Sequence, residues 1–146
     1  MLERANHCVY DVKYHMALCV KYRKKLLLTD EVVSFLFDVF KGLEERYFLA
    51  FETIGCDKDH CHVLVRAKPR YAPSRVMRVI KSLSARKLFE KFKWIKTELW
   101  GGEFWSDGGY IGTVGEGVNA EIIRKYIEKQ GKKYEKSQLR ITEFMR

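Results

Sequence analysis

The feature that most constrains the fold of this chain is a predicted β-hairpin that carries two histidines. Residues 47–55 and 60–67 are rich in apolar and β-branched side chains, and the polar segment 56–59 separates them, which is typical of two antiparallel strands joined by a turn. His60 and His62 open the second strand. Because successive side chains of a strand point to opposite faces, both imidazoles are expected side by side, with Cys61 on the other face. Together they would supply half of a metal site.

A His-x-His pair on a strand does not by itself establish a metal site, because structural histidines on half-buried strands are common. Cys56 and Cys61 next to the two histidines also suggest structural zinc. Strand alternation places Cys61 on the wrong face for this, and no second pair of ligands follows at zinc-finger spacing. The structural interpretation and the metal interpretation of the histidines both stay open at this point.

The elements around the hairpin predict the fold class. Their order is strand, helix, strand, strand, helix, strand and then one more helix; the predicted ranges are 14–22, 29–46, 47–55, 60–67, 74–92, the short strands 104–105 and 110–114, and 119–133. This order is typical of an α+β, ferredoxin-like or RRM-like antiparallel sheet with helices on one face. We expect one domain, 1–146, with a core at about 14–133 and a C-terminal helix added to it.

The last predicted helix carries two further candidate residues. Tyr126 and Gln130 are four residues apart, so they share one face of a helix, one turn from each other. Tyr134 and Gln138 repeat this spacing, but they follow Gly131, where we expect the helix to fray. Tyr126 is therefore the preferred candidate.

His60-Cys61-His62 at the end of a hairpin, followed by a C-terminal helix with Tyr126 and Gln130, resembles the single-tyrosine HUH transposases of the IS200/IS605 family. The resemblance covers roughly residues 14–133. It implies a transposase, a site-specific endonuclease that cleaves and rejoins single-stranded DNA at the ends of an insertion sequence.

The same resemblance implies roles for individual residues. Tyr126 would be the catalytic nucleophile and form a 5′-phosphotyrosine link, while His60, His62 and Gln130 would hold Mg²⁺ or Mn²⁺ as the metal cofactor. The partner would be single-stranded DNA with hairpin ends. The protein would be a homodimer in which the histidines of one chain face Tyr126 of the other.

This chemistry is consistent with the residue types. A phosphodiester resists nucleophiles because its charged oxygens repel them, and a divalent cation would neutralise one of those oxygens. A covalent phosphotyrosine conserves the energy of the broken bond, and the chain has no GxxxxGK phosphate loop for a nucleotide. Two imidazoles and an amide also suit softer cations than Mg²⁺. Glu52, on the neighbouring strand, is either a further ligand or base, or an exposed strand residue.

The charge of the chain favours an anionic partner. Lys and Arg number 28 against 19 Asp and Glu, a formal net charge of +9, which points to nucleic acid or a membrane surface. Basic residues gather at 21–25 and on the polar faces of the helix 74–92, where they could follow a DNA backbone. The chain has no apolar run of the roughly 18 residues that span a membrane, no signal-peptide pattern and no CxxC pair. We expect a DNA-associated, cytoplasmic protein of a prokaryote, with reduced thiols.

Glycines precede the last helix. Residues 115–120 match GxGxxA, but too little chain follows for a Rossmann unit. Gly112, Gly115 and Gly117 form either a joint that lets the Tyr126 helix move or an ordinary turn. Two rival functions also remain: a non-catalytic ferredoxin-like nucleic-acid-binding module, and a domesticated or plasmid-related HUH nuclease.

Overall fold

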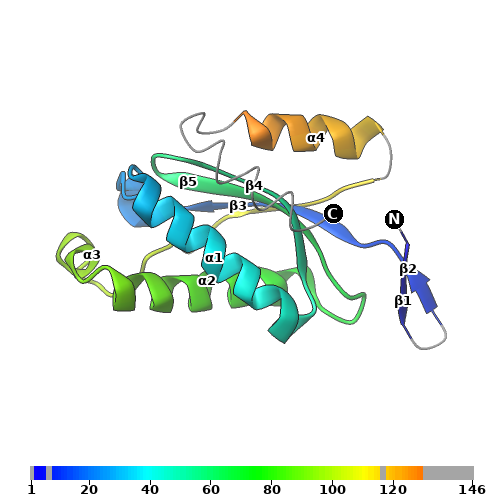
Figure 1. Cartoon of the computed structure of the whole chain (residues 1–146), viewed down its shortest axis with the longest axis horizontal. Coiled ribbons are helices and arrows are strands. Elements are labelled where there is room, and N and C mark those ends of the chain that lie inside the picture. The colour runs from blue at the N-terminus through cyan, green and yellow to red at the C-terminus, as the bar shows by residue number, and fades with distance from the viewer. Residues whose placement is uncertain (1, 6–7, 116–117, 130–146) are drawn as a thin grey trace.

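The computed structural model describes residues 2–5, 8–115 and 118–129. Its centre is an antiparallel sheet with the strand order β4-β5-β3-β6, made of β3 (Lys13–Cys19), β4 (Ala50–Asp57), β5 (His60–Arg66) and β6 (Tyr110–Thr113). Helices α1 (Asp30–Tyr47) and α2 (Pro73–Lys91) cover one face, and α4 (Val118–Glu128) lies over the other (Figure 1). The predicted α+β, ferredoxin-like class with an added C-terminal helix is confirmed.

Strand alternation assigns each side chain of the two central strands to one face. Met16 and Leu18 of β3 and Val63 and Val65 of β5 are fully buried in the core under α1 and α2. The residues between them in sequence face α4. The register pairs Ala17 with His62 and Cys19 with His60, so both histidines lie on the central strand β5, with His60 as its first residue.

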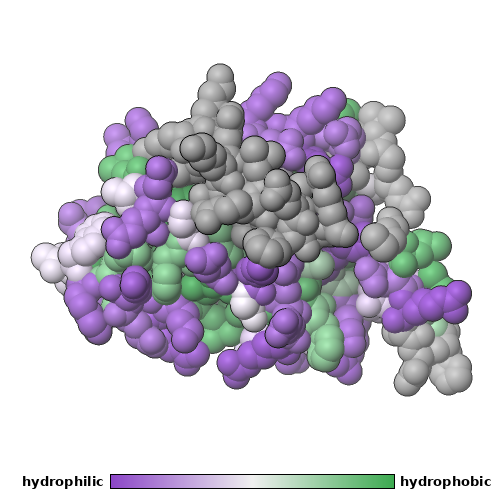
Figure 2. Space-filling model, viewed as in Figure 1, coloured by the Kyte–Doolittle hydropathy of each residue, from purple (hydrophilic) through white to green (hydrophobic). Residues whose placement is uncertain are grey.

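Local signals explain where α1 begins. The side-chain oxygen of Thr29 accepts a hydrogen bond from the backbone N–H of Val32 at 3.3 Å, and Asp30 and Glu31 occupy the first turn. An N-cap hydroxyl and acidic residues both stabilise the positive end of a helix. The predicted start at Thr29 is confirmed. The outward surfaces of α1 and α2 are largely hydrophilic (Figure 2).

The first central strand is shorter than predicted. It ends at Cys19, because Tyr22 and Arg23 have φ values of 60° and 54° and turn the chain into the 3-10 helix η1 (Lys21–Arg23). The strand predicted at 104–105 is only an isolated bridge between Val20 and Trp105. Apolar composition extends past the point where the backbone leaves the sheet, so composition alone overestimates the strand.

Besides η1, three further short elements were not predicted: β1 (Glu3–Ala5), β2 (Cys8–Tyr10) and α3 (Trp94–Glu98). Segments of three to five residues are too short to show a periodic pattern. All four cysteines are free thiols. Among the described residues, no helix combines the length and apolar character that crossing a bilayer requires.

Candidate active site

His60 and His62 lie side by side on the face of the sheet that α4 covers. Their ring centroids are 5.2 Å apart and the rings are nearly perpendicular, at 87°. Cys61 points into the opposite core, where its sulfur lies 3.1 Å from the sulfur of Cys56. The two cysteines therefore cannot join the histidines around one ion. In the described part of the chain, no three His, Cys, Asp or Glu side chains are grouped to hold a metal.

Asp59 orients His60 through one ring nitrogen. Its Oδ1 lies 2.8 Å from Nδ1 of His60, and its Oδ2 accepts from Nε of Arg23 at 3.1 Å. Partial burial acts to raise the pKa of Asp59, but the bond to His60 and the Arg23 charge outweigh it and lower that pKa. An ionised carboxylate can only accept, so Nδ1 of His60 carries a proton, and in the neutral ring the lone pair is on Nε2.

A third histidine, which the sequence analysis did not select, belongs to the same cluster. Nε2 of His15 lies 2.9 Å from Nδ1 of His62, and the ring centroids are 5.1 Å apart. His15 is on β3, opposite Leu64, so it reaches His62 diagonally across the strand pair. The only sequence signal for His15 is its place in the alternation of β3, where the odd-numbered residues face α4.

The environment keeps His62 neutral. Burial, followed by the neighbouring His15 and His60, lowers the pKa of His62 to about 4. Burial also lowers the pKa of His15. At neutral pH both rings therefore have one protonated and one unprotonated nitrogen, and an unprotonated nitrogen is what a metal ligand or a hydrogen-bond acceptor requires.

Tyr126 is brought to this cluster by α4. Its ring centroid lies 5.4 Å from that of His62 and 6.3 Å from that of His15, both edge-on. The side chain is 50% exposed, so one side of the ring contacts the histidines while the other remains accessible. Within a single chain, the structure thus joins the candidate nucleophile to the candidate metal ligands.

A small apolar cluster holds α4 on the sheet. Ile127 is fully buried against Leu64 and Val114, with Ile123 beside them. Gly55 of β4 makes the close approach possible, because a Cβ there would collide with the backbone carbonyl of Ile127. Glycine inside a strand often marks such a close backbone contact. This was the available sequence signal, and the sequence analysis did not use it.

Glu52 also connects α4 to the sheet. Its carboxylate lies 3.5 Å from Arg124 of α4 and 3.5 Å from Lys13 of β3. The register shifts between Phe51 and Thr53, so Glu52 is the extra residue of a bulge. Its side chain is only 17% exposed, so the alternative of an exposed strand residue is wrong, because the bulge turns Glu52 toward two cations.

Three sequence predictions concern residues outside the described ranges. Gln130, the predicted third metal ligand, is one of them, as are Tyr134 and Gln138. Gly117 of the predicted joint also lies outside. Their roles stay predictions.

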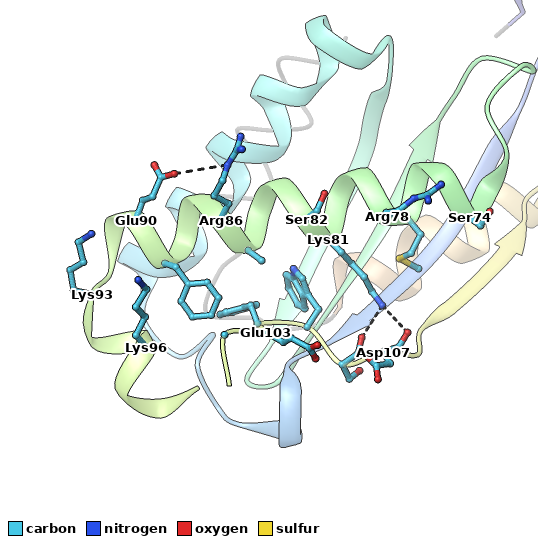
Figure 3. Close-up of a pocket in the computed structure, with 17 residues that line it drawn as sticks. Ser74, Arg78, Lys81, Ser82, Arg86, Glu90, Lys93, Lys96, Glu103 and Asp107 are labelled. Carbon is cyan, nitrogen blue, oxygen red and sulfur yellow. Dashed lines mark hydrogen bonds and ion pairs between the residues drawn. The ribbon is translucent and has the colours of Figure 1, made fainter. Parts of the chain in front are cut away.

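A basic groove lies on the opposite side of the molecule, along α2 (Figure 3). Its volume is about 890 Å³, and α2 together with the segment 102–107 forms its walls. The charged side chains that line it are Arg78, Lys81, Arg86, Lys93, Lys96, Glu90, Glu103 and Asp107. Lys81 donates to the backbone carbonyl oxygens of Ser106 and Gly108, which anchors this wall to the helix.

The basic run 21–25 is largely engaged in ion pairs. Lys21 lies 2.7 Å from Glu103, Arg23 3.1 Å from Asp59, and Lys24 3.7 Å from Glu98. These cations connect η1 to neighbouring segments. In the groove, by contrast, Arg78, Lys93 and Lys96 are exposed and form no ion pair with a described residue.

Three features define the class of this protein: the order of the strands, the paired histidines and a tyrosine on a helix across the sheet. Comparison with known proteins identifies that class. The family described as "Transposase IS200 like" matches residues 8–130, and the chain belongs to this IS200/IS605 family of single-tyrosine transposases. It is thus an enzyme of DNA cleavage and strand transfer, and the predicted resemblance is confirmed.

Individual relatives agree. The ISDra2 transposase TnpA of Deinococcus radiodurans is 35% identical over 129 residues, which cover 88% of this chain and 91% of that protein. The transposase for insertion sequence element IS200 of Salmonella typhimurium is 29% identical over 124 residues, covering 85% and 80%.

Solved structures share the fold. A crystal structure of a presumed transposase from Deinococcus radiodurans superposes with a TM-score of 0.71 at 30% identity, covering 88% of this chain and 97% of that one. A REP-associated tyrosine transposase bound to a REP hairpin has a TM-score of 0.58 at 13% identity, covering 87% and 70%. The second likeness concerns the fold alone.

Proposed function

We propose that this transposase cleaves and rejoins single-stranded DNA at the ends of an insertion sequence, through a 5′-phosphotyrosine link on Tyr126. The observation that carries the proposal is the edge-on contact between the rings of Tyr126 and His62, with centroids 5.4 Å apart. A half-exposed phenol beside the neutral imidazoles of His15 and His62 is accessible to a flexible DNA strand. A duplex would have more difficulty reaching it, because α4 stands on the same face of the sheet.

His60 and His62, with Gln130, would hold a divalent cation, Mg²⁺ or Mn²⁺. The donor set fits, because Asp59 and His15 engage Nδ1 of the two rings, and in the Nδ1–H tautomer Nε2 carries the lone pair. When bound, the cation would neutralise a non-bridging phosphate oxygen. Imidazole ligands favour Mn²⁺ over Mg²⁺, so Mn²⁺ is expected to bind more tightly in the absence of DNA.

Tyr126 then performs the covalent step. Its phenolic oxygen, after losing its proton, attacks the phosphorus and forms a Tyr–O–P bond, while the bond from phosphorus to the 3′ oxygen breaks. The leaving strand departs with a 3′-hydroxyl. Attack by another 3′-hydroxyl reverses the same chemistry and releases Tyr126, so no nucleotide cofactor is consumed.

The groove along α2 is the surface that we assign to hairpin DNA. Arg78, Lys93 and Lys96 would neutralise phosphates, with Arg86 at the same wall (Figure 3). Trp94 and Trp100 beside it are 48% and 84% exposed, and such side chains can stack on unpaired bases. The REP hairpin bound to the REP-associated tyrosine transposase, a protein that shares the fold, is the precedent for this kind of ligand.

A homodimer with shared active sites is also part of the proposal. β6 is an edge strand, and its Tyr110 and Ile111 are 54% and 39% exposed. An exposed apolar edge favours pairing with a second chain. In such a dimer the α4 helices could exchange, so that Tyr126 of one chain would meet His62 of the other.

The first experiment tests the nucleophile. We expect wild-type protein with Mn²⁺ and a hairpin-bearing oligonucleotide to give an adduct that survives denaturation, and mass spectrometry to locate it on Tyr126. Tyr126→Phe should abolish the adduct and leave oligonucleotide affinity within about twofold, since only the hydroxyl is lost. Tyr47→Phe, at the far end of α1, is the matched control. An adduct on Tyr126→Phe, or none on wild type with any hairpin tried, would contradict the proposal.

A mixing experiment tests the shared active site. Tyr126→Phe and His62→Ala are each expected to be inactive alone. If the sites are shared, a mixture of the two should regain adduct, and only on the His62→Ala chain, which retains its tyrosine. If both residues act within one chain, the mixture stays inactive and the shared arrangement is wrong.

The rival hypothesis of a non-catalytic RNA-binding sheet lacks support. RRM-type recognition uses aromatic side chains on an open sheet face. Here α4 lies across that face (Figure 1), and the central strands present His15, His60 and His62. A domesticated nuclease would retain the same site and differ only in its biological setting.

A further inference from the structure

We propose that His15 is a positioning residue for the metal site: it holds His62 in the tautomer whose Nε2 can bind a cation. This inference rests on the proposed function, in that His62 is taken as a metal ligand. It adds a residue to the site and assigns it a definite bond. The experiment below separates the two claims, because the bond can be measured without any metal.

The geometry around His15 favours a specific contact with His62. His15 faces α4 from β3, two residues before Ala17, which lies directly opposite His62. The methyl side chain of Ala17 leaves space above the sheet, and the two imidazoles meet across it with Nε2 of His15 2.9 Å from Nδ1 of His62. This distance is that of a well-formed hydrogen bond.

Two neutral imidazoles can form this bond in only two ways. Either Nδ1 of His62 donates its proton to His15, or Nε2 of His15 donates to His62. Only the first leaves Nε2 of His62 with a lone pair for a cation, because a neutral ring has one N–H. In water, an isolated imidazole favours neither tautomer strongly enough to keep Nε2 unprotonated for a cation. A fixed partner at Nδ1 is what selects the tautomer.

The neighbouring ligand has the same arrangement. Nδ1 of His60 lies 2.8 Å from Asp59, as Nδ1 of His62 lies 2.9 Å from His15. Each predicted ligand thus has a protein group at the same ring atom, a carboxylate in one case and an imidazole in the other. A neutral partner such as His15 suits His62, which is the more buried of the two rings and only 9% exposed. A carboxylate at the same place would lose its hydration, at a cost in free energy.

His15 also contacts Tyr126, the proposed nucleophile. Its orientation therefore affects both the predicted metal ligand His62 and the phenol. Its ring centroid lies 6.3 Å from that of Tyr126 and 5.3 Å from that of Tyr110, both edge-on. A ring that holds His62 on one side and packs near Tyr126 on another sets the spacing between the predicted ligand and the phenol. Loss of the ring should therefore affect metal binding first and the covalent step as a consequence.

The test compares two substitutions at one position. His15→Gln retains an acceptor, since its amide oxygen can take the Nδ1 proton of His62, whereas His15→Leu removes it. Mn²⁺ affinity is measured on DNA-free protein by titration calorimetry and by the electron paramagnetic resonance signal of free Mn²⁺. Lost outer-shell partners typically reduce metal affinity about 10- to 100-fold, so we expect at least about a tenfold loss in His15→Leu and about twofold or less in His15→Gln.

Tyr110→Leu serves as the matched control, and it is compared with wild type at the same oligomeric state, measured by size-exclusion chromatography, because Tyr110 also lies on the exposed edge strand β6. It removes another ring that contacts His15 but that forms no contact with His62 among the described residues. Its Mn²⁺ affinity should equal that of wild type. A loss as large as that of His15→Leu would mean that general loosening of the pocket, and not the bond at Nδ1, controls the metal, and the proposal would be overturned.

Nitrogen-15 spectra of the imidazole rings provide a readout that needs neither metal nor activity. In metal-free wild-type protein, His62 should be mainly the Nδ1–H tautomer, and His15→Leu should shift it toward Nε2–H. If wild-type His62 is Nε2–H, the inference about His15 is wrong even if Tyr126 still forms its adduct. If the tautomer is as expected but Mn²⁺ never binds, the proposed metal-dependent function fails and the positioning bond stands.

The remaining outcomes of the Mn²⁺ titrations also test whether His15 positions His62. Equal and large losses of Mn²⁺ affinity in both His15 variants would show that the imidazole itself is required, as for a direct ligand, and would overturn the positioning role. Unchanged affinity in both would overturn it as well. Should His15→Leu not fold, the wild-type spectrum and the Gln variant still distinguish these cases.

Discussion

The two faces of the sheet use the same strands for different purposes. Under α1 and α2, alternate residues of β3 and β5 join a large continuous core that includes Phe37, Phe40 and Phe51. Under α4, the other residues of those strands are mostly histidines and small side chains. Among the described residues, the buried apolar cluster there consists of Leu64, Val114 and Ile127, with Ile123 packed against it.

The two faces therefore have different roles: the α1 and α2 side contributes most of the stability, and the α4 side carries the candidate active site. Most of the apolar surface that drives folding is buried on the α1 and α2 side, because the hydrophobic contribution scales with buried area. Among the described residues, the α4 side has few buried apolar contacts, the ion pairs of the bulge residue Glu52 with Arg124 and Lys13, and a polar cluster. Elements with few buried contacts open locally at a lower free-energy cost than the whole domain. We therefore expect α4 to detach, with Tyr126, well before the rest unfolds.

The largest loss of stability should come from a substitution on the face of the sheet that α1 and α2 cover. Phe37→Ala removes a 1% exposed ring from beneath α1 and should lower the free energy of unfolding by about 3–5 kcal/mol, the usual range for a buried Phe. Urea denaturation followed by circular dichroism measures it. The fraction that is still folded should bind Mn²⁺ as wild type does. A loss below about 1 kcal/mol would contradict the assignment of stability to this face.

A substitution on the other face should separate function from stability. Gly55→Ala places a Cβ against the carbonyl of Ile127 and should push α4 off the sheet, slowing adduct formation by about tenfold or more, equivalent to about 1.4 kcal/mol. Because the core under α1 and α2 is untouched, the urea midpoint should change much less than for Phe37→Ala.

The matched control is Gly42→Ala in α1. A Cβ there meets nothing within 4 Å, and alanine in a helix is favoured over glycine by roughly 0.5–1 kcal/mol. It should stabilise the protein slightly and leave adduct formation unchanged. If Gly55→Ala reacts at the wild-type rate, the docking of α4 seen here is irrelevant to cleavage.

A smaller effect is expected for the ion pair that ties α4 to β4. Arg124→Gln removes the cation 3.5 Å from Glu52 and should slow adduct formation about two- to fivefold, in line with up to about 1 kcal/mol for partly exposed pairs. Added salt should reduce the difference from wild type. Glu121→Gln, which removes only the contact of Arg124 within the helix, is the control and should have no effect on the rate.

An effect of similar size concerns the pH dependence of stability in the metal-free protein. The pKa of His62 is lowered by burial to about 4, against about 6.5 for a free histidine. As pH falls below 6.5 the unfolded chain takes up the proton first, so the free energy of unfolding falls between pH 6.5 and about 4 and levels off below that. Removing the group should make this decline shallower, by on the order of 1 kcal/mol over the window.

Urea midpoints of wild type and His62→Gln at several pH values, in the presence of a chelator, measure this difference. Parallel curves would show that His62 titrates in the folded protein as it does in the unfolded chain. In that case the polar face would be more solvated than its contacts with His15 and Tyr126 imply.

Much of the fold could be predicted because its signals are local. The N-cap at Thr29 and the alternation in β5 each depend on a few consecutive residues, and both are present as expected. The strand that was predicted to reach Tyr22 ends at Cys19, because a change of backbone direction at two positive φ angles leaves no mark in composition. Glu52 was misjudged for a similar reason, since a bulge changes which face a strand residue occupies.

By itself, the sequence determined the family and the shared face of His60 and His62, since a two-residue period in a strand is a property of the local backbone. The tertiary structure alone decided that His15 meets His62, that Gly55 admits Ile127 and that Arg124 reaches Glu52. Those contacts depend on the register between strands and on where a helix lands on a sheet. Both are set by packing across the whole domain, which no local pattern encodes.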